Sequence, residues 1–153
     1  MAEKTNSSSE IINNTKGFLQ SINYIIEDPE IPKEFMGKPD FYAKKQDGVT
    51  TLEICGLVKN EIKDIPRAIT HLWTIKKQLG NQIDYIIVIP PVEESSVIEF
   101  LQSDNKKWLK KIKREKFHIW LSNSETKDIL AVYGTPSDEN IANKIEIKTL
   151  EIE

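Results

Sequence analysis

Hydrophobic side chains at helical spacing divide the chain into predicted helices. Such spacing predicts a first helix over roughly residues 9 to 27 and a second from about 64 to 79. Pro66 suits the first turn of the second helix, and Gly80 suits its end. Residues 93 to 103 and 105 to 116 also have helical patterns, with a break near Asp104. The stripe of the first helix consists of Ile11, Ile12, Thr15, Phe18, Leu19, Ile22, Ile25 and Ile26.

Shorter apolar runs predict strands. The run IDYIIVI, residues 83 to 89, is almost continuously apolar, as in a strand buried on both faces of a sheet. We expect it beside and parallel to the strand Val49–Cys55, joined to it by a right-handed crossover through the second helix. The runs FHIWL and ILAVY predict two later strands joined by a hairpin-like loop. The tail IEIKTLEIE alternates weakly.

This order of elements predicts an α/β protein with a mixed sheet flanked by helices on both faces. A length of 153 residues fits a single domain. We expect residues 1–8 to be a flexible lead-in and residues 137–153 to supply an edge strand or a loose tail. Residues 31–38 are too short and too rich in proline for an extra strand to be assigned there.

Composition narrows the functional classes. The net charge is −3, so binding to nucleic acid must rest on a local basic patch. The single cysteine, Cys55, excludes an internal disulfide and a zinc site built from cysteines. The sequence has no apolar run of membrane-spanning length and no signal-peptide pattern, which favours a cytoplasmic protein with no membrane partner.

A predicted hairpin around Asp47-Gly48 gathers polar side chains on one face. With Gln46 and Val49 as the flanking pair, Asp40 and Glu53 become diagonal neighbours with Cβ atoms about 7 Å apart. Their carboxylates could then share a magnesium ion. A three-residue Gln-Asp-Gly loop would change this pairing, and a solvent-facing hairpin surface would also carry such residues for solubility alone. One face carries Phe41, Ala43, Leu52 and Ile54, and the other carries Asp40, Tyr42, Lys44, Thr51, Glu53 and Cys55.

The Pro39-Asp40 pair, followed after a gap by Glu53-Ile54-Cys55, resembles the motif of the restriction-endonuclease-like, or PD-(D/E)xK, nuclease superfamily. The resemblance covers roughly residues 9 to 89. It implies an α-β-β-β-α-β core, here with an additional C-terminal helix and strands. It also implies a magnesium-dependent nuclease acting on DNA, with Asp40 and Glu53 as metal ligands and a lysine that activates the attacking water.

Cys55 stands where the family has that lysine. A neutral thiol supplies no positive charge, so another lysine would have to act: Lys44 across the hairpin is the first candidate, with Lys59 and Lys63 as alternatives. The acid that the family carries on its first helix is also not evident, because Glu10 and Glu27 lie only at the ends of the predicted helix. A catalytically inactive domain that binds nucleic acid, a protein partner or a second copy of itself is therefore the alternative.

One basic cluster, residues 105 to 116, is the candidate nucleic-acid surface. Its apolar stripe contains Trp108, and the alternative is the solvated face of an amphipathic helix. His71 and His118 are too far apart in sequence for ligand spacing, so we expect both to be structural. The predicted phosphate contacts are Lys106, Lys110, Lys113 and Arg114.

Overall fold

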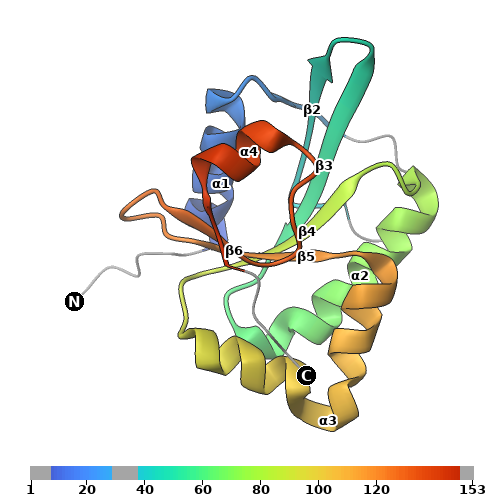
Figure 1. Cartoon of the computed structure of the whole chain (residues 1–153), viewed down its shortest axis with the longest axis vertical. Coiled ribbons are helices and arrows are strands. Elements are labelled where there is room, and N and C mark those ends of the chain that lie inside the picture. Colours follow the sequence, from blue (N-terminus) through green and yellow to red (C-terminus); the bar gives the residue numbers. More distant parts are fainter. Residues whose placement is uncertain (1–7, 29–37, 149–153) are drawn as a thin grey trace.

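The computed structural model describes residues 8–28 and 38–148. Within them the protein has an α/β fold: a seven-stranded mixed sheet with its strands in chain order, flanked by helices on both faces (Figure 1). The strands are β1 (Ile25–Ile26), β2 (Phe41–Asp47), β3 (Thr50–Val58), β4 (Asp84–Ile89), β5 (His118–Ser122), β6 (Ile129–Tyr133) and β7 (Glu146–Ile147). The helices are α1 (Ser8–Ser21), the 3-10 turn η1 (Ile62–Asp64), α2 (Ile65–Leu79), α3 (Glu94–Glu115) and α4 (Glu139–Lys144).

The centre of the sheet agrees with the sequence prediction. Strand β4 is the fourth of seven and runs parallel to both β3 and β5. Its residues Tyr85 to Ile89 are all buried, which explains the continuous apolar run. Helix α2 connects β3 to β4, as the predicted crossover requires, and β5 and β6 form the predicted antiparallel pair.

The first helix ends earlier than predicted. It stops at Ser21, and the backbone then passes through a left-handed conformation at Asn23, with a φ of 76°. Ile25 and Ile26, which continue the helical spacing in sequence, instead form β1 and pair with β2. Asparagine tolerates positive φ, and β-branched isoleucine favours an extended chain, so these local preferences outweigh the periodicity.

The hairpin pairs two residues out of the predicted register. Its two-residue turn is Gly48-Val49, and Asp47 pairs with Thr50. Gly48 has a φ of 64°, which fits a turn that needs positive φ only at its first central position. A slip of two residues preserves the side-chain faces, because strand side chains alternate with a period of two.

Each face of the sheet packs into its own core. The predicted apolar face, with Phe41, Ala43 and Ile54, belongs to the core under α1 and α4. The opposite face, with Tyr42 and Cys55, belongs to the core under α2 and α3. The predicted division into faces is confirmed, but the second face is a core surface for much of its length.

The C-terminal part adds a broken helix and an edge strand. Helix α3 is interrupted by non-helical backbone from Ser103 to Lys106, which confirms the predicted break near Asp104. Strand β7 forms the sheet edge next to β6. Residues 1–7, most of the segment 31–38, and residues 149–153 lie outside the described part of the chain. Among the described residues, no helix has both the length and the apolar character to cross a bilayer.

Candidate functional site

The hairpin does not bring Asp40 and Glu53 together in the predicted way. Glu53 lies opposite Lys44, so it is four residues along the ladder from Asp40, or roughly 13 Å at the usual rise of a strand. The Asp40 carboxylate instead accepts a hydrogen bond from the Val58 backbone N–H at 2.7 Å. The predicted diagonal pairing is therefore wrong, and the cause is the two-residue slip in register.

Glu53 lies in a cluster of its own. Its carboxylate accepts a hydrogen bond from the Tyr42 hydroxyl. The Lys44 amine lies 4.0 Å from the Glu53 carboxylate and 3.8 Å from the carboxylate of Glu27, which follows β1. Burial, together with the contact to Glu53, raises the pKa of Tyr42, so the phenol keeps its proton. The Lys44 ammonium thus lies between the carboxylates of Glu27 and Glu53. Of these two carboxylates, that of Glu53 is largely buried.

Cys55 contributes no charge to this face. Its side chain is fully buried between the sheet and α2. Burial, and secondarily the negative charge of Asp40, raises the pKa of the thiol to about 12. The side chain is therefore a neutral thiol at physiological pH, and it acts as a small apolar core residue.

The structure distinguishes among the three lysines that could replace the one missing from the motif. Lys44 lies beside Glu53, as described above. Lys63 is exposed and pairs with Glu61 at 2.9 Å. Lys59 extends the β3 ladder, where its N–H donates to Val88, and its side chain lines a groove on α2.

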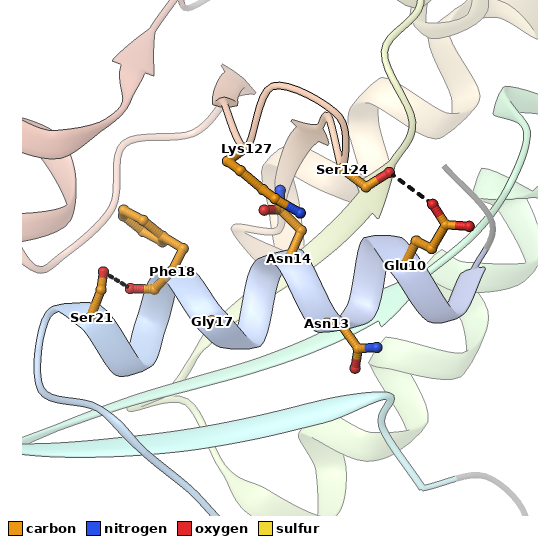
Figure 2. Close-up of a pocket in the computed structure, with 8 residues that line it drawn as sticks. All are labelled: Glu10, Asn13, Asn14, Gly17, Phe18, Ser21, Ser124 and Lys127. Atoms are coloured by element: carbon orange, nitrogen blue, oxygen red, sulfur yellow. Dashed lines mark hydrogen bonds between the residues drawn. The ribbon is translucent and has the colours of Figure 1, made fainter. Parts of the chain in front are cut away.

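Glu10, the acid at the start of α1, lies on the opposite side of the sheet from Glu53. Helix α1 packs into the core that contains Phe41, whereas Glu53 bonds Tyr42 on the opposite face. Figure 2 shows Glu10 directed toward Ser124, whose hydroxyl lies 3.4 Å from the carboxylate. Glu10 and Glu53 are therefore not parts of one site, and Glu27 is the acid that reaches the Lys44 cluster. Within residues 8–28 and 38–148, no three His, Cys, Asp or Glu side chains converge as a metal site.

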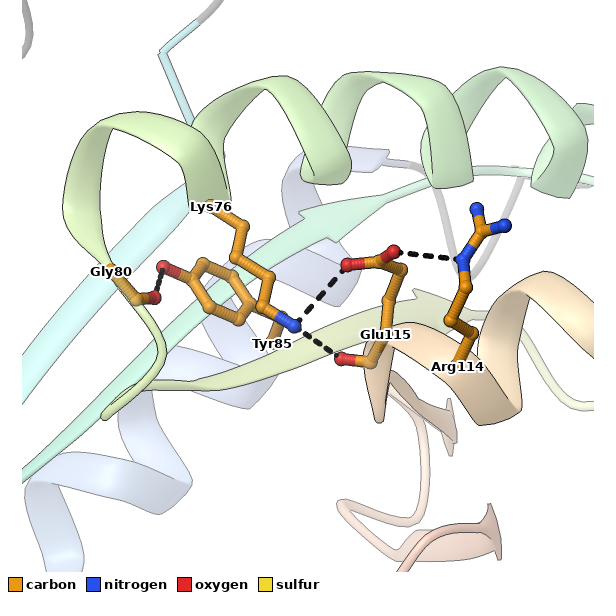
Figure 3. Close-up of polar contacts among 5 residues, drawn as sticks. All are labelled: Lys76, Gly80, Tyr85, Arg114 and Glu115. Carbon is orange, nitrogen blue, oxygen red and sulfur yellow. Dashed lines mark hydrogen bonds and ion pairs between the residues drawn. The ribbon is translucent and has the colours of Figure 1, made fainter.

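The second polar region is the outer surface of α2 and α3. Lys110, Lys113 and Arg114 are exposed there and Lys106 is partly exposed. Arg114 also lies 3.1 Å from the Glu115 carboxylate. Lys76 of α2 holds the two helices together, since its amine donates to the Glu115 backbone carbonyl at 2.8 Å and lies 3.3 Å from the Glu115 carboxylate (Figure 3).

A groove of about 670 Å³ lies on this surface, between one side of α2 and Trp108 of α3. Two cationic side chains, Lys59 and Arg67, line it, and none of its described lining residues is Asp or Glu. The amines of Lys107 and Lys111 lie 4.8 and 5.0 Å from the centre of the Trp108 ring. The sequence does not indicate this role for Lys59 or Arg67, because their approach to Trp108 depends on how α2 packs against α3.

The two histidines differ in their surroundings. His118 is buried at the start of β5, and its Nε2 lies 3.9 Å from Asp84. Burial lowers its pKa, although the charge of Asp84 opposes this effect. His71 lies in the groove on α2. The two histidines thus belong to different elements, β5 and α2, and their structural role stays a prediction.

Comparison with known proteins gives a match in fold. No protein-family model and no curated protein match the chain. An fdxN element excision controlling factor protein from Anabaena variabilis shares the fold, with a TM-score of 0.51 and 15% identity over 79% of this chain and 95% of that one. An XisH family protein from Nostoc punctiforme gives a TM-score of 0.48 and 16% identity over 78% of this chain and 95% of that one.

Proposed function

We propose that this protein is a non-catalytic relative of restriction-endonuclease-like nucleases and that it binds nucleic acid through the outer surface of α2 and α3. The observation that carries the proposal is the position of Lys44, whose ammonium lies between the carboxylates of Glu27 and Glu53. A metal-dependent nuclease needs a metal ion beside such carboxylates to activate water and to stabilise charge on the phosphate. The ammonium nearest Glu53 is that of Lys44, and Asp40, the other predicted ligand, is bonded to the Val58 N–H instead of lying beside Glu53.

The remaining parts of the hairpin support the same proposal. Asp40 is bonded to the Val58 backbone and lies well away from Glu53 along the ladder. The Cys55 thiol is neutral and buried, so it cannot replace a lysine beside a phosphate. If Asp40 and Glu53 do bind magnesium, with Lys44 as the activating lysine, the protein is instead the divergent nuclease that the motif implies.

The nucleic-acid partner is inferred from charge. The protein is acidic as a whole, yet α3 carries Lys106, Lys110, Lys113 and Arg114 on its outer side. Basic side chains that contact phosphates release condensed counterions, which makes affinity depend steeply on salt. One protein of similar fold is named as a controlling factor for the excision of an element. For this chain we propose DNA as the partner on the ground of the basic side chains of α3.

Binding and cleavage measured on the same preparation test the proposal. Labelled single-stranded and duplex oligonucleotides and a supercoiled plasmid are incubated with the protein, with and without Mg²⁺. We expect retention of labelled DNA in both conditions and an intact plasmid in both. Mg²⁺-dependent cleavage that disappears in Glu53→Gln and Lys44→Ala would establish the nuclease alternative. A failure to bind any of the three nucleic acids would remove nucleic acid as the partner.

A further inference from the structure

We propose that the groove between α2 and Trp108 binds single-stranded nucleic acid, with an unpaired base stacked on the Trp108 ring and the backbone passing Lys59 and Arg67. The inference rests on the proposed binding of nucleic acid and specifies which form of nucleic acid this surface takes. In this proposal the strand binds mainly along the side of α3 that faces α2, and the outermost lysines of α3 lie at the margin of the site.

The groove has the charge that a phosphate backbone requires. Arg67 is exposed on α2, and Lys59 enters the groove from the end of β3. Two threonines on the same side of α2, Thr70 and Thr74, place hydroxyl oxygens along the lining. Each hydroxyl donates to a backbone carbonyl of its own helix, at 3.2 and 3.1 Å, so each oxygen can accept a hydrogen bond from a base amino group.

Trp108 supplies the aromatic surface. It is partly buried against the core under α2 and α3, so its ring is anchored, while the same residue lines the groove. The Lys107 and Lys111 amines lie over this ring, 4.8 and 5.0 Å from its centre, so a base stacks on Trp108 by taking the place of an ammonium, which can then contact a phosphate. A positively charged groove combined with an aromatic platform is the usual arrangement in proteins that bind single strands.

This arrangement favours a single strand over a duplex for a geometric reason. In a duplex both faces of each base are covered by neighbouring bases, so no base can stack on a tryptophan without leaving the helix. An unpaired base exposes its ring face at no such cost. The groove is shallow and open to solvent, so a strand can lie along it without being enclosed.

Trp73 provides a matched control. It is 39% exposed on α2 and has the Lys77 amine 3.6 Å from its ring centre, yet it does not line the groove. We compare the binding of a labelled oligothymidylate and of a duplex of the same length to the wild-type chain, Trp108→Leu, Trp73→Leu and Arg67→Gln. Thermal unfolding of each variant confirms that it is folded, and Trp108→Phe retains an aromatic ring at the same position.

We expect the wild-type chain to bind the single strand more tightly than the duplex. Trp108→Leu should weaken single-strand binding by at least about fivefold, as for the loss of one stacked base, while Trp108→Phe keeps most of the affinity. Arg67→Gln should reduce the slope of log affinity against log salt by about 0.7, as for one lost phosphate contact on a single strand. Trp73→Leu should bind like the wild type.

A fluorescence measurement gives an independent readout. In Trp73→Phe the two remaining tryptophans are Trp108 and Trp120, and Trp120 is fully buried. Quenching by oligothymidylate in this variant therefore reports on Trp108. Equal affinity for duplex and single strand, with no effect of Trp108→Leu and no quenching, would overturn the inference while leaving nucleic-acid binding by α3 intact. A chain that binds neither oligonucleotide would instead overturn the proposed function itself.

Discussion

The hairpin and the α2–α3 surface use charged side chains in opposite ways. On the hairpin, Lys44 lies between Glu27 and Glu53, so positive and negative charges offset one another within the protein. In the groove on α2, none of the described residues that line the groove with Lys59 and Arg67 is Asp or Glu. Charges that are paired within the protein attract a charged ligand only weakly, whereas a group of charges of one sign attracts a ligand of the opposite sign. The region that resembles a nuclease motif is thus the less suited of the two to bind phosphate.

Lys45, next to Lys44 on β2, forms a buried ion pair that we expect to stabilise the fold. Lys45 lies on the opposite face from Lys44, and its buried amine is 2.6 Å from the buried carboxylate of Asp138, which also accepts from the Tyr24 hydroxyl at 2.8 Å. Asp138→Ala should lower the free energy of unfolding by about 3–5 kcal/mol, because it leaves a buried ammonium without its partner. Urea unfolding measures this. A loss below about 1 kcal/mol would show that the pair is as weak as a surface pair.

The pair of Lys45 and Asp138 also predicts that the stability of the fold decreases at acid pH. Burial tends to raise the pKa of Asp138, but its hydrogen bonds from Lys45, Asn140 and Tyr24 outweigh that effect and lower it. A carboxyl group with a lowered pKa in the folded state stabilises the fold above its unfolded-state pKa, and this contribution disappears as pH falls through the folded pKa. We expect stability to decline below about pH 4, the ordinary range for Asp. Asp138→Asn should show a shallower decline, and an identical decline would assign the acid sensitivity to other groups.

Removing charge from α3 should affect binding and leave stability nearly unchanged. Replacing Lys106, Lys110 and Lys113 by Ala should lower the slope of log affinity against log salt by about 2–3, as for three lost phosphate contacts. Lys44→Gln is the control, since it removes one positive charge from the hairpin and should leave the slope as it is. An unchanged slope in the triple variant would identify α3 as a solvated helix face.

The smallest expected effect concerns Cys55. Because burial raises its pKa to about 12, the thiol stays protonated in the fold well above the pH at which an unfolded cysteine ionises. Stability should therefore fall slightly as pH rises past about 8.5, the range in which the unfolded chain gains a thiolate. Cys55→Ala should remove this alkaline decline. Rapid reaction of native Cys55 with a thiol reagent at neutral pH would contradict the buried, neutral thiol.

The sequence was sufficient to predict elements with a strong pattern. The continuous apolar run of β4 and the amphipathic stripe of α2 both predicted their elements, because burial on two faces or on one side leaves a distinct spacing. The faces of the hairpin were also predicted correctly, since an error of two residues in register does not exchange them.

The sequence was insufficient wherever the outcome depended on local backbone geometry or on packing between distant segments. Asn23 ends α1 through its left-handed backbone, although Ile25 and Ile26 continue the helical spacing. Gly48, in the first position of the turn, sets the register that moves Glu53 opposite Lys44. The approach of Arg67 and Lys59 to Trp108 follows from contact between α2 and α3, which no local pattern encodes.

Calorimetric titration of Mg²⁺ into the wild-type chain, Glu53→Gln and Lys44→Met tests the central claim that Lys44 supplies the cation of the hairpin site. The account predicts no Mg²⁺ binding in the wild type that depends on Glu53. It also predicts a weak site in Lys44→Met, where Glu27 and Glu53 lose their ammonium, with no such site once Glu53→Gln is added to that variant. Wild-type binding of Mg²⁺ that disappears in Glu53→Gln would contradict the claim and restore the metal-dependent nuclease as the better account.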